Sequence, residues 1–91
     1  MNHQVTERPK IDLTKVKSSQ IESIGHHPES STLAIRFHPK DGEPEGSGGL
    51  YHYANFTGDD FDLFKSAESI GSHFYKHIKN NKEKHPYTRI E

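Results

Sequence analysis

The chain has 91 residues, of which 29% are hydrophobic and 27% charged, a composition that suits one small domain with a lean core. A formal net charge of −1 argues against a protein that coats nucleic acid through its overall charge. The sequence has no cysteine, which excludes disulfides, thiol catalysis and thiolate zinc sites, and no apolar run approaches the roughly 18 residues of a membrane span. Because the polar first ten residues also lack a hydrophobic signal segment, we expect a cytoplasmic protein. Because a core this small gives modest stability, we expect either a monomer or a homodimer that shares core surface.

The first strands are predicted after a polar lead. Residues 1–15 show no clear hydrophobic period and are expected to form a flexible lead, with a short added strand over residues 11–16 as the alternative. In a predicted strand over residues 21–26, Ile21 and Ile24 are three apart, so we expect either a bulge near Glu22 and Ser23 or a strand with two apolar faces. The cleanest alternation follows in residues 32–38, which place three apolar side chains on one face: Leu33, Ile35 and Phe37.

A loop rich in glycine and proline separates this strand from the next. Residues 39–49 contain four glycines and two prolines, so we expect a long, mobile hairpin loop leading to a third strand over residues 50–56. No Gly-Lys-Ser/Thr sequence follows the glycines, which argues against a phosphate-binding loop.

Two helices are predicted next. Thr57, followed by Asp60 three residues later, is typical of a helix start. Interruptions at Ser69 and Gly71 favour a short helix over residues 59–67 and a longer one over residues 69–80. An apolar stripe at helical spacing runs through both: Leu63, Ala67, Ile70, Phe74 and Ile78.

These elements predict an α+β fold. The expected architecture is a small antiparallel meander of three or four strands, the last over residues 87–90, with two helices packed on one face. The predicted core is Leu33, Ile35, Phe37, Phe56, Phe61, Phe64, Ile70, Phe74 and Ile78.

Two tyrosines form the first candidate binding feature. Tyr51 and Tyr53 are two apart on a predicted strand, so both rings project from the same face. Paired aromatic faces on a sheet stack unpaired bases, at about 1–3 kcal/mol per base. The alternative is that both rings pack against a helix as core aromatics. The residues alone leave both interpretations open.

Basic side chains in the C-terminal third form the second feature. Lysines at such spacing contact successive phosphates and give a salt-dependent affinity, whereas the alternative is a solvated helix face whose lysines favour the helix dipole. The basic residues are Lys76, Lys79, Lys82, Lys84 and Arg89, and Tyr75 lies next to the first of them.

The sequence predicts no metal site, no cofactor and no enzyme. His73 and His77 are four apart on the predicted second helix, a workable spacing for two metal ligands. A catalytic HExxH motif would need glutamate after His73, where this chain has Phe74, and a third ligand would have to come from elsewhere in the chain. No catalytic constellation is present.

An ordered series of short matches resembles the KTSC family over residues 16–90. The matches are Val16-Lys17-Ser18-Ser19-Gln20-Ile21, Ile24-Gly25, the alternating Leu33, Ile35 and Phe37, Tyr51-His52-Tyr53, Ala67-Glu68-Ser69-Ile70-Gly71 and His85-Pro86-Tyr87-Thr88-Arg89-Ile90. The family takes its name from a domain at the C-terminus of some lysyl-tRNA synthetases and also occurs as free-standing small bacterial and phage proteins. This sequence departs from the pattern by an insertion in residues 39–49 and by extra residues at 80–83. The matching glycines are expected to be structural, Gly25 for a turn and Gly71 for close helix packing.

The resemblance implies a non-catalytic module that binds RNA, either a tRNA or a single strand. Its implied contact residues are Tyr51, Tyr53, Tyr75, Lys76, Lys79, Lys82 and Arg89. The alternative is a protein-interaction module, a phage or plasmid product that docks on a host protein through a sheet edge.

Overall fold

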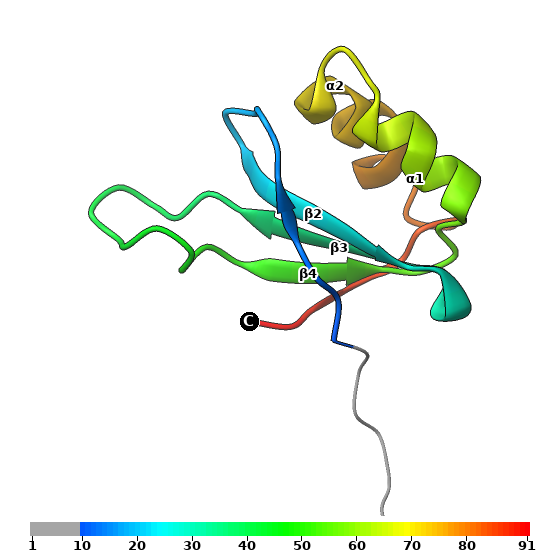
Figure 1. Ribbon diagram of the computed structural model, residues 1–91, viewed down its shortest axis with the longest axis horizontal. Coiled ribbons are helices and arrows are strands. Elements are labelled where there is room, and N and C mark those ends of the chain that lie inside the picture. The colour runs from blue at the N-terminus through cyan, green and yellow to red at the C-terminus, as the bar shows by residue number, and fades with distance from the viewer. Residues whose placement is uncertain (1–9) are drawn as a thin grey trace, which may run out of the picture.

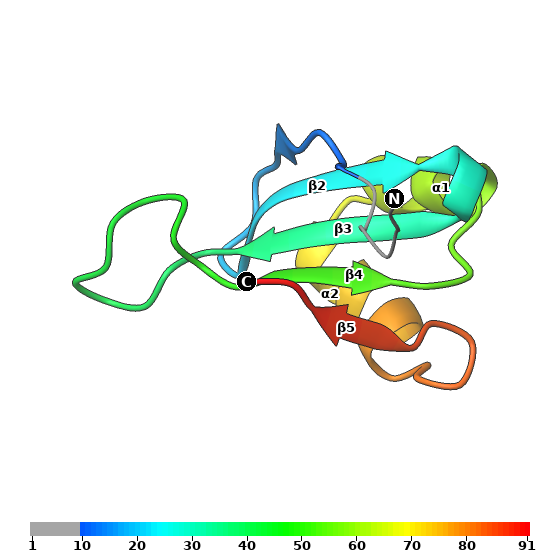
Figure 2. The same ribbon diagram turned by 90° about the horizontal axis from the view of Figure 1, so that it is seen from below.

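Five antiparallel strands in simple chain order form the sheet of this protein, and Figure 2 shows β2, β3, β4 and β5 side by side. The computed structural model describes residues 10–91. The strands are β1 (Thr14–Lys15), β2 (Ile21–His27), β3 (Thr32–Phe37), β4 (Leu50–Tyr53) and β5 (Tyr87–Arg89). The helical segments are a 3₁₀ turn, η1 (Pro28–Ser30), the helices α1 (Gly58–Lys65) and α2 (Ile70–Phe74), and a π-helical turn, η2 (Tyr75–Lys79).

The predicted α+β class is confirmed, with α1 and α2 on one face of the sheet (Figure 1). The sheet has five strands instead of three or four, because β1 pairs with β2 through Thr14 opposite Ile24 and Lys15 opposite Ser23. The short added strand is therefore formed at the end of the predicted lead, whose residues 1–9 lie outside the described part of the chain. Within residues 10–91, no helix is both long and apolar enough to cross a membrane.

The predicted bulge in β2 is confirmed. Ile21 pairs with Phe37 and Ser23 with Arg36, so Glu22 is the extra residue between them. The extra residue restores alternation, and both Ile21 and Ile24 are buried, at 0% and 2% exposed.

Local capping sets the ends of the helices. The Thr57 hydroxyl accepts a hydrogen bond from the Asp60 N–H at 3.1 Å, and the Asp60 carboxylate accepts one from the Thr57 N–H at 3.2 Å. The Ser69 hydroxyl caps α2 by accepting from the Ser72 N–H. The break between α1 and α2 confirms the prediction of two helices. The predicted apolar stripe was wrong at Leu63, because this side chain does not face the core and is 65% exposed.

The core lies between the sheet and the helices. Seven of the nine predicted core residues are buried, while Phe37 and Phe61 are only partly buried and pack at its margin. The bulge and the register of β4 add three more members to the core, which are Ile21, Ile24 and Tyr53.

Gly25 lies in the middle of β2, so the predicted turn there was wrong. A Cβ atom at this position would stand 2.1 Å from the carbonyl oxygen of Asp12, which means that the segment before β1 crosses the strand at a distance only glycine permits. At Gly71 a Cβ would meet Ser18 Oγ at 3.5 Å, an ordinary contact, so the close packing predicted there was also wrong.

Candidate nucleic-acid interface

The register of β4 decides which way the two tyrosines face. Tyr51 pairs with Ile35 and Tyr53 with Leu33, so both rings share the face of the core. Tyr53 is only 5% exposed, and its ring centroid lies 5.8 Å from that of Phe74. Burial, with a smaller contribution from the neighbouring phenols, raises the pKa of Tyr53 far above its ordinary value. Tyr53 is therefore a neutral core aromatic, as the alternative interpretation expected, and Tyr51 is half-buried beside it.

A groove of about 780 Å³ brings most of the predicted contact residues together. It involves β4, β5 and the helical segment of α2 and η2, where β5 forms the open edge of the sheet (Figure 2). Its aromatic lining is Phe37, Tyr51, Tyr53, Phe74 and Tyr87. Its cationic lining is Lys40, Lys79, Lys82 and Arg89, against one carboxylate, Glu43. The groove is thus aromatic and predominantly basic.

Tyr87 is the exposed aromatic ring of this groove, at 52% exposed. Its ring centroid lies 5.7 Å from that of Tyr51 and 5.9 Å from that of Tyr53, so the two inner tyrosines hold it from one side. Tyr87 was not among the contact residues predicted from the sequence. The available signal was its position two residues before Arg89, which places both side chains on the same face of β5.

The cationic groups are held beside the aromatic rings. The Arg89 guanidinium carbon lies 5.8 Å from the centroid of the Tyr51 ring, and Arg89 Nε donates to the backbone oxygen of Glu91 at 3.0 Å. Lys79 Nζ lies 5.6 Å from the centroid of Tyr75. Lys79, Lys82 and Arg89 are all exposed, so their charges are available to a ligand in water.

Two of the predicted contact residues do not line the groove. Tyr75 is 56% exposed and contacts the groove only indirectly, through the Lys79 side chain above its ring. Lys76 is also exposed and is not part of the groove lining, although it lies three residues before Lys79 on η2. The predicted basic surface is therefore divided between two faces of η2.

The paired histidines lie at a separate depression of about 550 Å³ beside α1. The ring centroids of His73 and His77 are 4.7 Å apart. Partial burial lowers the pKa of His73, the neighbouring His77 lowers it further, and Asp60 partly opposes both. Within residues 10–91, these two rings gather no third His, Cys, Asp or Glu ligand atom at metal-binding separation.

The fold and the groove define a small α+β domain with an aromatic and basic groove along one edge of its sheet. The family model for the KTSC domain matches residues 17–81, and the chain belongs to this family. Solved structures match as well, among them the crystal structure of a KTSC domain protein from Yersinia pestis. That chain is 29% identical, with a TM-score of 0.71, and the match covers 90% of this chain and 100% of the other. No curated protein matches the chain.

Proposed function

We propose that this KTSC protein is a non-catalytic module that binds single-stranded RNA in the groove between β5 and η2. The observation that carries the proposal is one exposed aromatic ring, Tyr87, in the same groove as the cations of Lys79, Lys82 and Arg89. Proteins that bind single strands combine these two features, a stacking ring and positive charges that follow the backbone.

Stacking on Tyr87 supplies the contact to a base. An unpaired base has an accessible π-face, whereas a base inside a duplex does not, so this contact selects single strands, loops and ends. Tyr51 and Tyr53 pack against Tyr87, and this support limits the rotamer freedom that the ring loses when a base stacks on it. The role of Tyr53 is then to support the ring that binds.

The cations supply contacts to the phosphates flanking that base. Three exposed cations give a weak affinity, on the order of micromolar to millimolar, that falls as salt rises. The net charge of −1 for the whole chain means that attraction depends on this local group of charges. A tRNA presents suitable targets in its loops and its single-stranded end.

The proposal is tested by fluorescence anisotropy with a labelled single-stranded oligoribonucleotide at about 50 mM salt. We expect Y87A to weaken binding by roughly tenfold, which is the loss of one base stack, and K79A to weaken it about threefold. K76A is the matched control, because it removes the same charge from the same helical turn but outside the groove. Equal effects of K79A and K76A, or wild-type affinity in Y87A, would count against groove binding.

One observation favours a second candidate function, strand addition by a protein partner. All three residues of β5 are exposed, and β5 is an edge strand. The Ile90 N–H donates to the Leu50 carbonyl and the Ala54 N–H to the Pro86 carbonyl, so antiparallel alternation turns the Arg89 N–H away from β4. A partner strand would pair with that outward row of backbone groups.

The variants R89P and R89A separate strand addition from groove binding. Both remove the guanidinium, but only R89P removes the outward N–H. In a pulldown with a candidate partner, capture lost in R89P and kept in R89A supports strand addition. Capture that survives in R89P means the partner does not add a strand here, and RNA binding weakened equally in both variants points back to the groove.

A further inference from the structure

A buried carboxylate without a cationic partner lies at the bulge of β2. Glu22 is only 8% exposed. Within residues 10–91, no Lys, Arg or His forms an ion pair with the Glu22 carboxylate. Its Oε2 accepts a hydrogen bond from the Gly46 N–H at 3.1 Å, which attaches the loop of residues 39–49 to the bulge. Buried charges in proteins are usually paired or coordinate metal ions.

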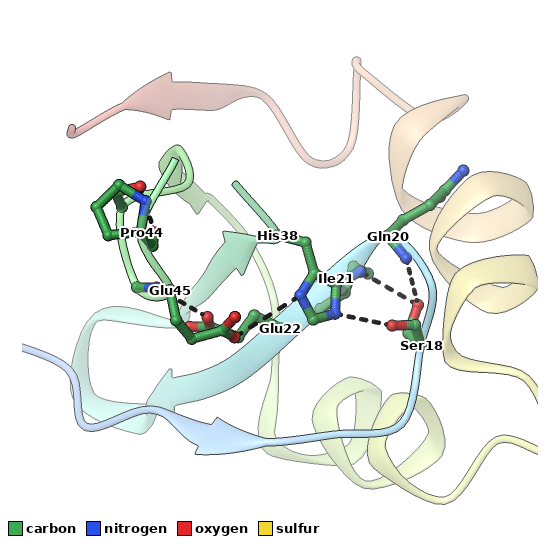
Figure 3. Close-up of polar contacts among 9 residues, drawn as sticks. Ser18, Gln20, Ile21, Glu22, His38, Pro44 and Glu45 are labelled. Carbon is green, nitrogen blue, oxygen red and sulfur yellow. Dashed lines mark hydrogen bonds and ion pairs between the residues drawn. The ribbon is translucent and has the colours of Figure 1, made fainter. Parts of the chain in front are cut away.

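His38 presents a lone pair toward the same point. Its Nε2 lies 2.9 Å from the carbonyl oxygen of Ser18, and because a carbonyl only accepts, Nε2 carries the proton. In the neutral ring Nδ1 is then unprotonated, and it lies 4.0 Å from Glu45 Oε1 (Figure 3). One ligand atom from each of Glu22, His38 and Glu45 lies within 4.8 Å of the other two.

We propose that Glu22, His38 and Glu45 bind a divalent transition metal ion of the zinc type. Three acceptor atoms that converge within 4.8 Å of one another favour positive charge between them. A proton on His38 Nδ1 would serve one contact, whereas a metal ion serves all three. The sequence predicted no metal site, and this cluster carried no sequence signal, because its three ligands are far apart in the sequence and converge only through the bulge and the loop.

The geometry requires only a small adjustment. Zinc bonds of about 2.0–2.1 Å in a tetrahedral arrangement place ligand atoms about 3.4 Å apart. The three ligand atoms lie within 4.8 Å of one another, so each separation must close by at most about 1.4 Å. Glu45 is an exposed residue of a long loop and can supply this movement. The Ser18 carbonyl already fixes the ring of His38, as acceptors behind metal-bound histidines do.

The imidazole ligand favours zinc, cobalt or nickel over magnesium and calcium, which prefer oxygen ligands throughout. Water would complete the coordination, since His38 and Glu45 are exposed. The bound ion would join β2, the end of β3 and the loop, and thereby order a segment whose sequence predicts mobility.

The test is calorimetric titration of the full chain with zinc chloride, accompanied by the visible absorption of cobalt(II). We expect one ion per chain, at least a tenfold loss of affinity in E22Q and H38Q, and no competition from an excess of magnesium. E22Q is nearly isosteric and keeps an acceptor for the Gly46 N–H, so it should retain the fold. H77Q is the matched control, because it removes a histidine from the pair beside α1 and should leave the affinity unchanged.

Three results would overturn the proposal: no zinc uptake at millimolar concentration, binding that E22Q and H38Q both retain, or binding that only H77Q abolishes. Glu22 does not line the groove proposed for RNA. Loss of zinc binding in E22Q with unchanged RNA affinity would therefore support the metal site independently of the proposed function.

Discussion

At the scale of single residues, Tyr53 and Tyr87 show how neighbouring tyrosines on one face can serve different roles. They are cross-strand partners, but Tyr53 is 5% exposed and Tyr87 52% exposed. We predict that Y53A lowers the free energy of unfolding by about 3–5 kcal/mol, because it leaves a cavity against Phe74. Y53F should cost less than about 1.5 kcal/mol, since the ring remains. Urea unfolding of both variants measures this, and a Y53A protein as stable as wild type would show that the ring is not part of the core.

The sequence predicted that the side chains of Tyr51 and Tyr53 share one face of their strand. It did not predict whether that face is turned toward the core or toward solvent. Alternation places both on one side of β4, and this is observed. The other side of the strand carries Leu50 and Ala54 as well as His52, so hydrophobicity did not distinguish the buried face. The pairing of β4 with β3 supplied the missing information, which is not local to β4.

The histidine pair predicts a specific loss of stability in acid. The pKa of His73 is lowered from 6.5 in the folded protein, so the unfolded chain binds more protons below that pH. The stability that depends on neutral His73 is therefore complete above pH 6.5 and is lost as the pH falls toward the folded-state pKa. H77Q removes a neighbouring imidazole that lowers this pKa. An NMR titration should show the His73 pKa rising in H77Q, and an unchanged value would mean that His77 does not contribute to the shift.

At the scale of elements, the helix boundaries that could be predicted from the sequence are those marked by capping residues. The start of α1 followed from Thr57 and Asp60, whose reciprocal hydrogen bonds need only four consecutive residues. The predicted helix over residues 69–80 proved to be α2 followed by the π-helical turn η2, a change that no local signal announced. The strand β1 remained one of two alternatives, because two exposed residues carry no usable alternation.

The close approach at Gly25 gives a prediction about β1. A Cβ in G25A would overlap the carbonyl of Asp12, so the segment before β1 must move away or β2 must distort. We expect G25A to lose more than about 1 kcal/mol of stability. G58A is the control, because a Cβ there meets nothing within 4 Å and alanine favours the first turn of α1. Thermal unfolding compares the two, and hydrogen exchange at Thr14 and Lys15 should accelerate only in G25A.

At the scale of the whole molecule, the long loop connects the two proposed sites. It contributes Lys40 and Glu43 to the groove and Glu45 to the cluster at the bulge, and it extends beyond the sheet in Figure 2. His38 lines the groove and also belongs to the cluster. The loop of residues 39–49 therefore lies at the point where both proposed sites meet. The composition of residues 39–49 predicted a loop, but its contacts depend on strands on either side of it.

The local arrangement of charge in a nearly neutral protein predicts a definite salt dependence of RNA binding. Four cations and the carboxylate of Glu43 line the groove, which leaves three net positive charges. These would release counterions with a log–log slope of about −2 for a single strand, so affinity should fall roughly twentyfold between about 50 and 200 mM salt. The double variant K79A/K82A leaves one of the three, and its affinity should fall only about threefold over the same range. K76A should keep the full slope, because its charge lies outside the groove. Identical slopes in all three proteins would show that the attraction comes from the general surface and that the groove does not hold the phosphates.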